Sequence, residues 1–196
     1  MRKIGIVGAI GSGKSFVGAL LRNHGYRVLD ADQAVHDLYR DCSDLRSVIR
    51  CAFGPYCLTS DGVNRQFFAD LVFRDHDARR RLESLVYPYL SQVALDFFDD
   101  PERPYEKGIR FFEAALMNRL PEVCEVLDEI WVVTAPEELR LERLIARGLS
   151  DEDARRRIDT QRMLALPNHP NIREIENTGD ADSLLAIISQ LLGREL

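Results

Sequence analysis

The sequence lacks the features that identify several large protein classes. Its four cysteines, Cys42, Cys51, Cys57 and Cys124, form no CxxC pair and have no histidine at zinc-site spacing, so we expect reduced thiols. No apolar run approaches the roughly 18 residues of a membrane span, and the N-terminus has no signal-like hydrophobic segment. We therefore expect a cytoplasmic protein with no membrane partner.

An excess of basic charge is also missing. The 26 lysines and arginines are outnumbered by 32 aspartates and glutamates, which gives a formal net charge of −6. A broad nucleic-acid-binding surface needs clustered positive charge, so nucleic acid is not an expected partner. The motifs DxxG and NKxD, which regulatory GTPases carry, do not occur.

What the sequence does contain is a phosphate-binding loop near its N-terminus. Residues 8–15 read GAIGSGKS and fit GxxxxGK[ST], between a predicted strand at residues 3–7 and a segment with helical apolar spacing. Such a loop points backbone N–H groups at phosphate oxygens, its lysine reaches the β- and γ-phosphates, and its serine binds Mg²⁺. The alternative is a glycine-rich turn without nucleotide. The residues expected to contact the nucleotide here are Gly8, Ala9, Ile10, Gly11, Ser12, Gly13, Lys14, Ser15 and Phe16.

Acidic residues follow two further predicted strands. Residues 26–29 lead into Asp30 and Asp32, and residues 108–113 end at Glu113. Ligands of parallel sheets collect at the carboxyl ends of strands, and phosphoryl transfer needs a carboxylate to orient the attacking hydroxyl. Asp32 is thus a candidate base, and Glu113 a candidate ligand of Mg²⁺ or its water. The alternative is that both acids cap the segments that follow them.

Arginines on a predicted helix after residue 136 are candidate anion ligands. Arg140, Arg143 and Arg147 share one helical face, and none has an acidic residue four positions earlier. In the next predicted helix, residues 155–157 are arginines that each follow an acidic residue by four, so we expect these arginines to be paired. Arg143 and Arg147 are therefore the expected phosphate contacts.

The remaining pattern predicts an α/β fold. Strands are expected at residues 130–134 and 173–176 in addition to the three above, and residues 64–100 predict an inserted helical lobe. Small-molecule kinases of the phosphate-loop class combine an acidic pair after the second strand, a helical lobe over the acceptor and an arginine-bearing lid. All three features occur here in order, with a lid expected at about 136–166.

Taken together, these motifs and their order along the whole chain resemble the dephospho-CoA kinase family. The resemblance lies in GAIGSGKS at 8–15, LDAD at 29–32, DGVNR at 61–65, RRRLESLVYP at 79–88, VVTAPEELRLERLIARGLS at 132–150, RRRIDTQ at 155–161 and ENTG at 176–179. It implies a single kinase domain over residues 1–196, a three-layer α/β/α core with a five-stranded parallel sheet, an acceptor-binding lobe and a lid.

The resemblance also implies a reaction and roles for residues. The reaction is the ATP-dependent phosphorylation of the ribose 3′-hydroxyl of dephospho-CoA, the last step of CoA biosynthesis, with Mg²⁺ as cofactor. The expected catalytic residues are Lys14, Asp32 and Arg143. The expected acceptor-side residues are Asp30, Asp32, Arg65, Tyr87 and Glu113.

Some positions depart from the family pattern, and they lie on the acceptor side. Val7 stands where the family generally has threonine, Tyr87 where it has histidine, and residues 115–119 lack its usual proline and glutamate. Two other functions therefore stay open: a kinase for another small acceptor, such as a nucleoside, nucleotide or sugar acid, and a nucleotide-binding regulator without transfer activity. The sequence predicts no particular oligomeric state.

Overall fold

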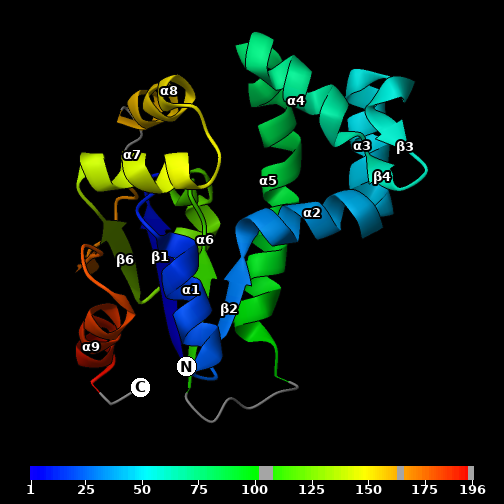
Figure 1. The fold of residues 1–196 in the computed structure, drawn as a ribbon. Coiled ribbons are helices and arrows are strands. Elements are labelled where there is room, and N and C mark those ends of the chain that lie inside the picture. Colours follow the sequence, from blue (N-terminus) through cyan, green and yellow to red (C-terminus); the bar gives the residue numbers. More distant parts are fainter. Residues whose placement is uncertain (102–107, 163–165, 194–196) are drawn as a thin grey trace. The chain divides into compact units, whose positions relative to one another are not determined.

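A computed structural model describes residues 1–101, 108–162 and 166–193 (Figure 1). The chain divides into two compact units. The first, here called the sheet unit, comprises Met1–Asp30 and Pro101–Leu196, and the second, the helical unit, comprises Ala31–Asp100.

The sheet unit is built on five parallel strands in the order β2-β5-β1-β6-β7. The strands are β1 (Arg2–Gly8), β2 (Arg27–Asp30), β5 (Ile109–Glu113), β6 (Glu129–Thr134) and β7 (Ile172–Glu176). Because all five are parallel, their carboxyl ends meet at one edge, which brings together the loop after β1, Asp30 and Glu113. The predicted five-stranded parallel sheet is confirmed.

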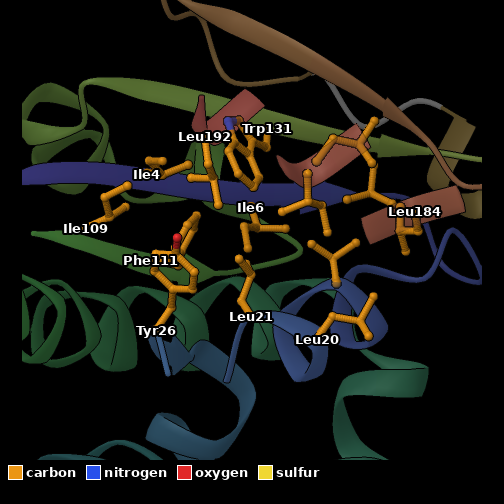
Figure 2. Packing of buried hydrophobic residues seen from close by; sticks show 14 residues of the cluster. Ile4, Ile6, Leu20, Leu21, Tyr26, Ile109, Phe111, Trp131, Leu184 and Leu192 are labelled. Atoms are coloured by element: carbon orange, nitrogen blue, oxygen red, sulfur yellow. The ribbon is translucent and has the colours of Figure 1, made fainter. Parts of the chain in front are cut away.

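Helices cover both faces of this sheet. The helical segments of the sheet unit are α1 (Lys14–Asn23), η2 (Met117–Arg119), α6 (Pro121–Val126), α7 (Glu137–Ala146), α8 (Asp151–Arg162) and α9 (Ala181–Leu192). Helices α1 and α9 pack on one face, where Leu21, Phe111 and Trp131 are fully buried in a shared apolar cluster (Figure 2). On the other face, a β-carbon added to Gly5 would lie 2.7 Å from Leu127 Cδ1, just after α6. The predicted three-layer architecture is confirmed.

Helices α7 and α8 pack against each other through Leu144, Ala154 and Ile158. Ser150 caps α8: its Oγ accepts a hydrogen bond from the Asp153 N–H at 3.1 Å and donates to Asp153 Oδ2 at 3.0 Å. These two helices make up most of the predicted lid at 136–166, of which residues 163–165 lie outside the described part of the chain.

The helical unit has its own apolar core. Its elements are α2 (Ala31–Asp41), α3 (Ser43–Phe53), η1 (Pro55–Cys57), β3 (Leu58–Thr59), β4 (Gly62–Val63), α4 (Arg65–Arg74) and α5 (His76–Asp99). Buried residues of this core include Leu45, Ile49, Phe68 and Val86. The helices expected at residues 64–100 belong to this unit, together with α2 and α3. Helix α5 contains Pro88 and continues past it.

All four cysteines are free thiols, as predicted. None of the helices in the described part of the chain combines the length and the apolar composition of a membrane span.

Candidate active site

The loop between β1 and α1 has the backbone that its glycines predict. Gly11 has φ 78°, and Gly13, the N-cap of α1, has φ 97° and ψ 22°. Both values lie in the left-handed region, which side chains disfavour. Gly8 is required for a different reason, since a β-carbon there would lie 2.5 Å from the Val133 carbonyl oxygen. The start of the loop therefore packs directly against the backbone of β6, with no side chain at Gly8 to separate them.

Several backbone N–H groups of this loop have no hydrogen-bond acceptor in the described part of the chain. The N–H of Ser12 donates to Ala9 O at 3.1 Å, and that of Phe16 to Gly13 O at 3.0 Å. By contrast, the N–H groups of residues 11, 13, 14 and 15 have no acceptor within the described ranges. Backbone donors near a helix N-terminus are a common site for phosphate, because the helix dipole adds to their attraction for an anion.

The carbonyl groups of the loop are held by side chains from elsewhere in the sheet unit. Arg140 Nε donates to Ile10 O at 2.8 Å, and Arg143 Nη1 to the carbonyls of Gly11 and Ser12, both at 3.3 Å. Asn177 Nδ2 also donates to the Ser12 carbonyl, at 2.8 Å. In a trans peptide the N–H points opposite to the C=O. Holding the Ile10 and Ser12 carbonyls therefore fixes the directions of the Gly11 and Gly13 N–H groups.

Carboxylate and hydroxyl oxygens lie next to the loop. Ser15 Oγ donates to Glu113 Oε1 at 2.7 Å, while Glu113 Oε2 is buried and has no hydrogen-bond partner in the described residues. Asp30 is paired with Glu113 in register on the neighbouring strand. Burial raises the pKa of Glu113 above its ordinary value and Asp30 adds to this rise, while Ser15 and Lys14 act to lower it.

This oxygen set suits a magnesium ion. Mg²⁺ prefers oxygen ligands and usually keeps several waters, with one or two protein ligands and the substrate phosphates completing its shell. The serine hydroxyl and the unpartnered Glu113 Oε2 fit that requirement. Within the described residues there is no group of three or more His, Cys, Asp or Glu side chains placed to bind a metal alone.

The two predicted lid arginines differ in their surroundings. Arg143 Nη2 donates to the Asn177 carbonyl at 3.0 Å, in addition to the loop contacts above. Arg147, the C-cap of α7, is exposed, and none of the described residues hydrogen-bonds to its side chain. In α8, Arg155 pairs with Asp151 at 2.8 Å, as the charge spacing predicts.

Three further predicted site residues belong to the helical unit. Asp32 is exposed in the first turn of α2, inside the helix rather than at its N-cap. Arg65 Nη1 lies 3.2 Å from His36 Nδ1. Burial raises the pKa of Tyr39 to about 12, opposed by the charge of Arg65. Tyr87 is half-buried in α5. The structure thus brings together the loop, Lys14, Asp30, Glu113 and Arg143 in the sheet unit, and places Asp32, Arg65 and Tyr87 in the other unit.

The sequence interpretation did not assign roles to two residues that contact the loop. These are Asn177, described above, and Gln161, whose Oε1 accepts from the Ile10 N–H at 2.5 Å. Asn177 directly follows the carboxyl end of β7, and the rule that ligands collect at strand ends applies to it as well as to Asp30 and Glu113.

A small cavity adjoins the loop. It measures about 80 Å³ and includes Val7 and Ala115, two positions that depart from the family pattern, with Gly8 and Gln161 also in its lining. A larger cavity of about 620 Å³ around Cys124 and His169 contains no loop residue. The candidate site is assigned to the loop because the unpaired donors and the buried carboxylate lie there.

Comparisons with known proteins agree with this geometry. A model of the dephospho-CoA kinase family matches residues 2–166. A dephospho-CoA kinase of Symbiobacterium thermophilum is 37% identical over 189 residues, which are 93% of this chain and 76% of the relative. One of Staphylococcus aureus is 31% identical over 195 residues, 98% of this chain and 92% of the relative.

Solved structures show the same fold. A Thermus thermophilus protein superposes with a TM-score of 0.72 at 31% identity, covering 98% of this chain and 96% of its own. A dephospho-CoA kinase from Campylobacter jejuni gives a TM-score of 0.65 at 22% identity, covering 98% of both chains. With a family model that spans most of its length and relatives of this similarity, the chain belongs to the dephospho-CoA kinase family.

Proposed function

We propose that the protein transfers the γ-phosphoryl group of ATP to the ribose 3′-hydroxyl of dephospho-CoA, giving CoA and ADP in the last step of CoA biosynthesis. The observation that carries this proposal is the phosphate loop: side chains donate to its carbonyls at residues 10 and 12, and its N–H groups at residues 11, 13, 14 and 15 are unpaired among the described residues. Family membership supplies the acceptor. A cytoplasmic location, with no membrane or nucleic-acid partner, is part of the proposal.

The loop and Lys14 bind the triphosphate in this proposal. Backbone N–H groups contact the phosphate oxygens, and the Lys14 ammonium approaches the β- and γ-phosphates. Ser15 and Glu113 would hold Mg²⁺, which when bound neutralises charge on the phosphates. The raised pKa of Glu113 fits this role, because a carboxylate that is costly to ionise alone gains most from a nearby cation.

The transferred phosphoryl group is loosely bonded in the transition state, so the rate depends mainly on how the reactants are positioned and on how the charge of the phosphoryl oxygens is stabilised. We assign Arg143 and Arg147 to its oxygens, with Arg147 bringing a guanidinium that no described residue engages. Asp32 accepts a hydrogen bond from the ribose hydroxyl and takes its proton as the new P–O bond forms, since the hydroxyl is too weak an acid to ionise beforehand.

The helical unit holds the acceptor in this proposal. Arg65 supplies a positive charge for anionic groups of dephospho-CoA, and Tyr87 supplies an aromatic surface. Asp30 completes the acidic pair with Asp32 at the start of this unit. The helices α7 and α8 act as the lid over the nucleotide.

A comparison of acceptors tests the proposal. The purified protein with Mg-ATP is given dephospho-CoA, adenosine, AMP or gluconate, and kcat/KM is measured for each by ADP release. We expect dephospho-CoA to be preferred by more than about 100-fold, because a site built to hydrogen-bond polar substrate groups can discriminate by roughly 10⁴ to 10⁵. A higher kcat/KM for another acceptor would replace dephospho-CoA as the substrate, and ATP binding without transfer to any of them would favour the regulator.

A further inference from the structure

Asn177 connects three parts of the sheet unit that meet at the phosphate loop. Its side-chain Nδ2 donates to the Ser12 carbonyl at 2.8 Å, its own carbonyl accepts from Arg143 Nη2 at 3.0 Å, and its Oδ1 lies 3.4 Å from the same nitrogen. Its backbone N–H donates to Thr134 O at 2.8 Å. The residue is only 3% exposed.

The backbone bond and the side-chain bond of Asn177 do different things. The bond to Thr134 ties the end of β7 to the end of β6, and any residue except proline makes it. The side-chain bond is made by the amide group alone, and it holds the loop. A substitution by any residue except proline therefore keeps the attachment of the two strands and removes the two side-chain contacts, to the Ser12 carbonyl and to Arg143 Nη2.

The side chain acts on the peptide that joins Ser12 to Gly13. The Ser12 carbonyl accepts two hydrogen bonds, from Asn177 and from Arg143, which together use both of its lone pairs. Because the peptide is planar and trans, fixing this carbonyl also fixes the Gly13 N–H on the opposite side. There is no room for a side chain between Gly13 and Asn177, because a β-carbon on Gly13 would overlap Asn177 Nδ2.

We propose that Asn177 is a positioning residue for phosphoryl transfer, which holds the Ser12–Gly13 peptide in the orientation that presents the Gly13 N–H to the nucleotide phosphates and sets Arg143 beside it. The inference rests on the proposed kinase function. It requires no contact between Asn177 and the substrates, because the residue acts through the loop backbone and through Arg143.

Two substitutions and one control test this role. Asn177→Leu keeps the branched shape of the side chain and introduces no charge, while it removes the donor to Ser12 and the side-chain oxygen near Arg143; the backbone carbonyl that accepts from Arg143 stays. Asn177→Ala is the second variant, in case leucine does not pack. The control is Asn171→Ala: Asn171 precedes β7 as Asn177 follows it, and its Nδ2 donates to the Asp128 carbonyl at 3.0 Å, away from the loop.

Two measurements are made on each full-length variant. The first is the affinity for Mg-ATP, by titration with a fluorescent ATP analogue, and the second is kcat and KM for transfer to dephospho-CoA. We expect Asn177→Leu and Asn177→Ala to lose about 5- to 30-fold in kcat/KM for ATP, corresponding to one or two hydrogen bonds, while Asn171→Ala stays near wild type.

Coupling to Arg143 separates positioning from a general loss of stability. Arg143→Ala is measured alone and in the Asn177→Leu protein. If Asn177 positions Arg143, the substitution at 143 costs clearly less in the double variant than in the wild-type protein. Additive losses, wild-type kinetics in both Asn177 variants, or an equal loss in Asn171→Ala would each overturn the inference. If wild-type protein binds ATP but does not phosphorylate dephospho-CoA, the proposed function fails, and the ATP titrations still decide the role of Asn177.

Discussion

Substituting alanine for Gly13 measures how tightly the phosphate loop is held. Gly13 has φ 97°, and a β-carbon there would overlap Asn177 Nδ2. A left-handed backbone costs an alanine roughly 1–2 kcal/mol. Moving the Asn177 amide away breaks its buried bond to Ser12, which costs about 1–3 kcal/mol more. We expect Gly13→Ala to lower the free energy of unfolding by about 2–5 kcal/mol.

Gly148 is a matched control for the backbone part of this cost. Its φ is 93°, close to that of Gly13, but a β-carbon added to it would have no heavy atom within 4 Å among the atoms that the structure describes. Gly148→Ala should therefore lower the free energy of unfolding only by the cost of the left-handed backbone, roughly 1–2 kcal/mol. The difference between the two variants in the free energy of unfolding measures the cost of the clash with Asn177.

Urea unfolding followed by tryptophan fluorescence is the assay. The chain has one tryptophan, and Trp131 is fully buried in the core of the sheet unit, so its emission reports the unit that carries the loop. With a denaturant slope of ~1–3 kcal/mol per molar urea, the expected difference is readily resolved. Equal losses in Gly13→Ala and Gly148→Ala would refute the reasoning, because the loop would then have room for a side chain.

Three further predictions concern catalysis and pH. Asp32→Asn should lower kcat by about 10²- to 10⁴-fold and leave ATP affinity nearly unchanged, as compared by steady-state kinetics and nucleotide titration; a loss below about tenfold would remove Asp32 from the role of base. Lys14→Ala should weaken both ATP binding and turnover, and unaltered turnover would contradict the assignment of the loop. Asp180 caps α9 by accepting from the Ser183 N–H at 2.9 Å, a bond that holds its pKa below the ordinary value of 3.8. Since the folded-state pKa is the lower one, this stabilisation is present above pH 3.8 and is lost as the pH falls through the folded-state value. Asp180→Ala should thus be less stable than wild type at neutral pH in urea unfolding, with a difference that narrows in acid; a difference independent of pH would contradict the cap.

The sequence predicted the sheet because its strands and the loop carry strong local signals. Residues 3–7 and 130–134 are short, apolar and rich in β-branched residues, and they became β1 and β6 with only small shifts at their ends. The acidic ends of two other strands also followed from topology, because parallel strands share one carboxyl edge. Asp30 and Glu113 are accordingly paired in register.

The contacts that hold the loop were harder to foresee. The prediction that Arg143 contacts phosphate did not include the hydrogen bonds from its guanidinium to loop carbonyls and to Asn177. A backbone carbonyl that accepts a hydrogen bond cannot be recognised in a sequence, since every residue has a carbonyl. Asn177 lies 165 positions from its partner Ser12, so no local spacing rule connects them. The alternative that Asp32 caps α2 required the helix to begin after Asp32, whereas α2 begins at Ala31. Sequence patterns place a helix boundary only to within a few residues.

The central claim is transfer of phosphate to the ribose 3′-hydroxyl of dephospho-CoA, and the identity of the product tests it most directly. The purified protein is incubated with Mg-ATP and either dephospho-CoA or its 3′-deoxy analogue, and the products are analysed by mass spectrometry and ³¹P NMR. The account predicts one added phosphate, as a 3′-monoester, on dephospho-CoA and none on the analogue. Phosphate on the analogue, or no product from dephospho-CoA while ATP is bound, would contradict it.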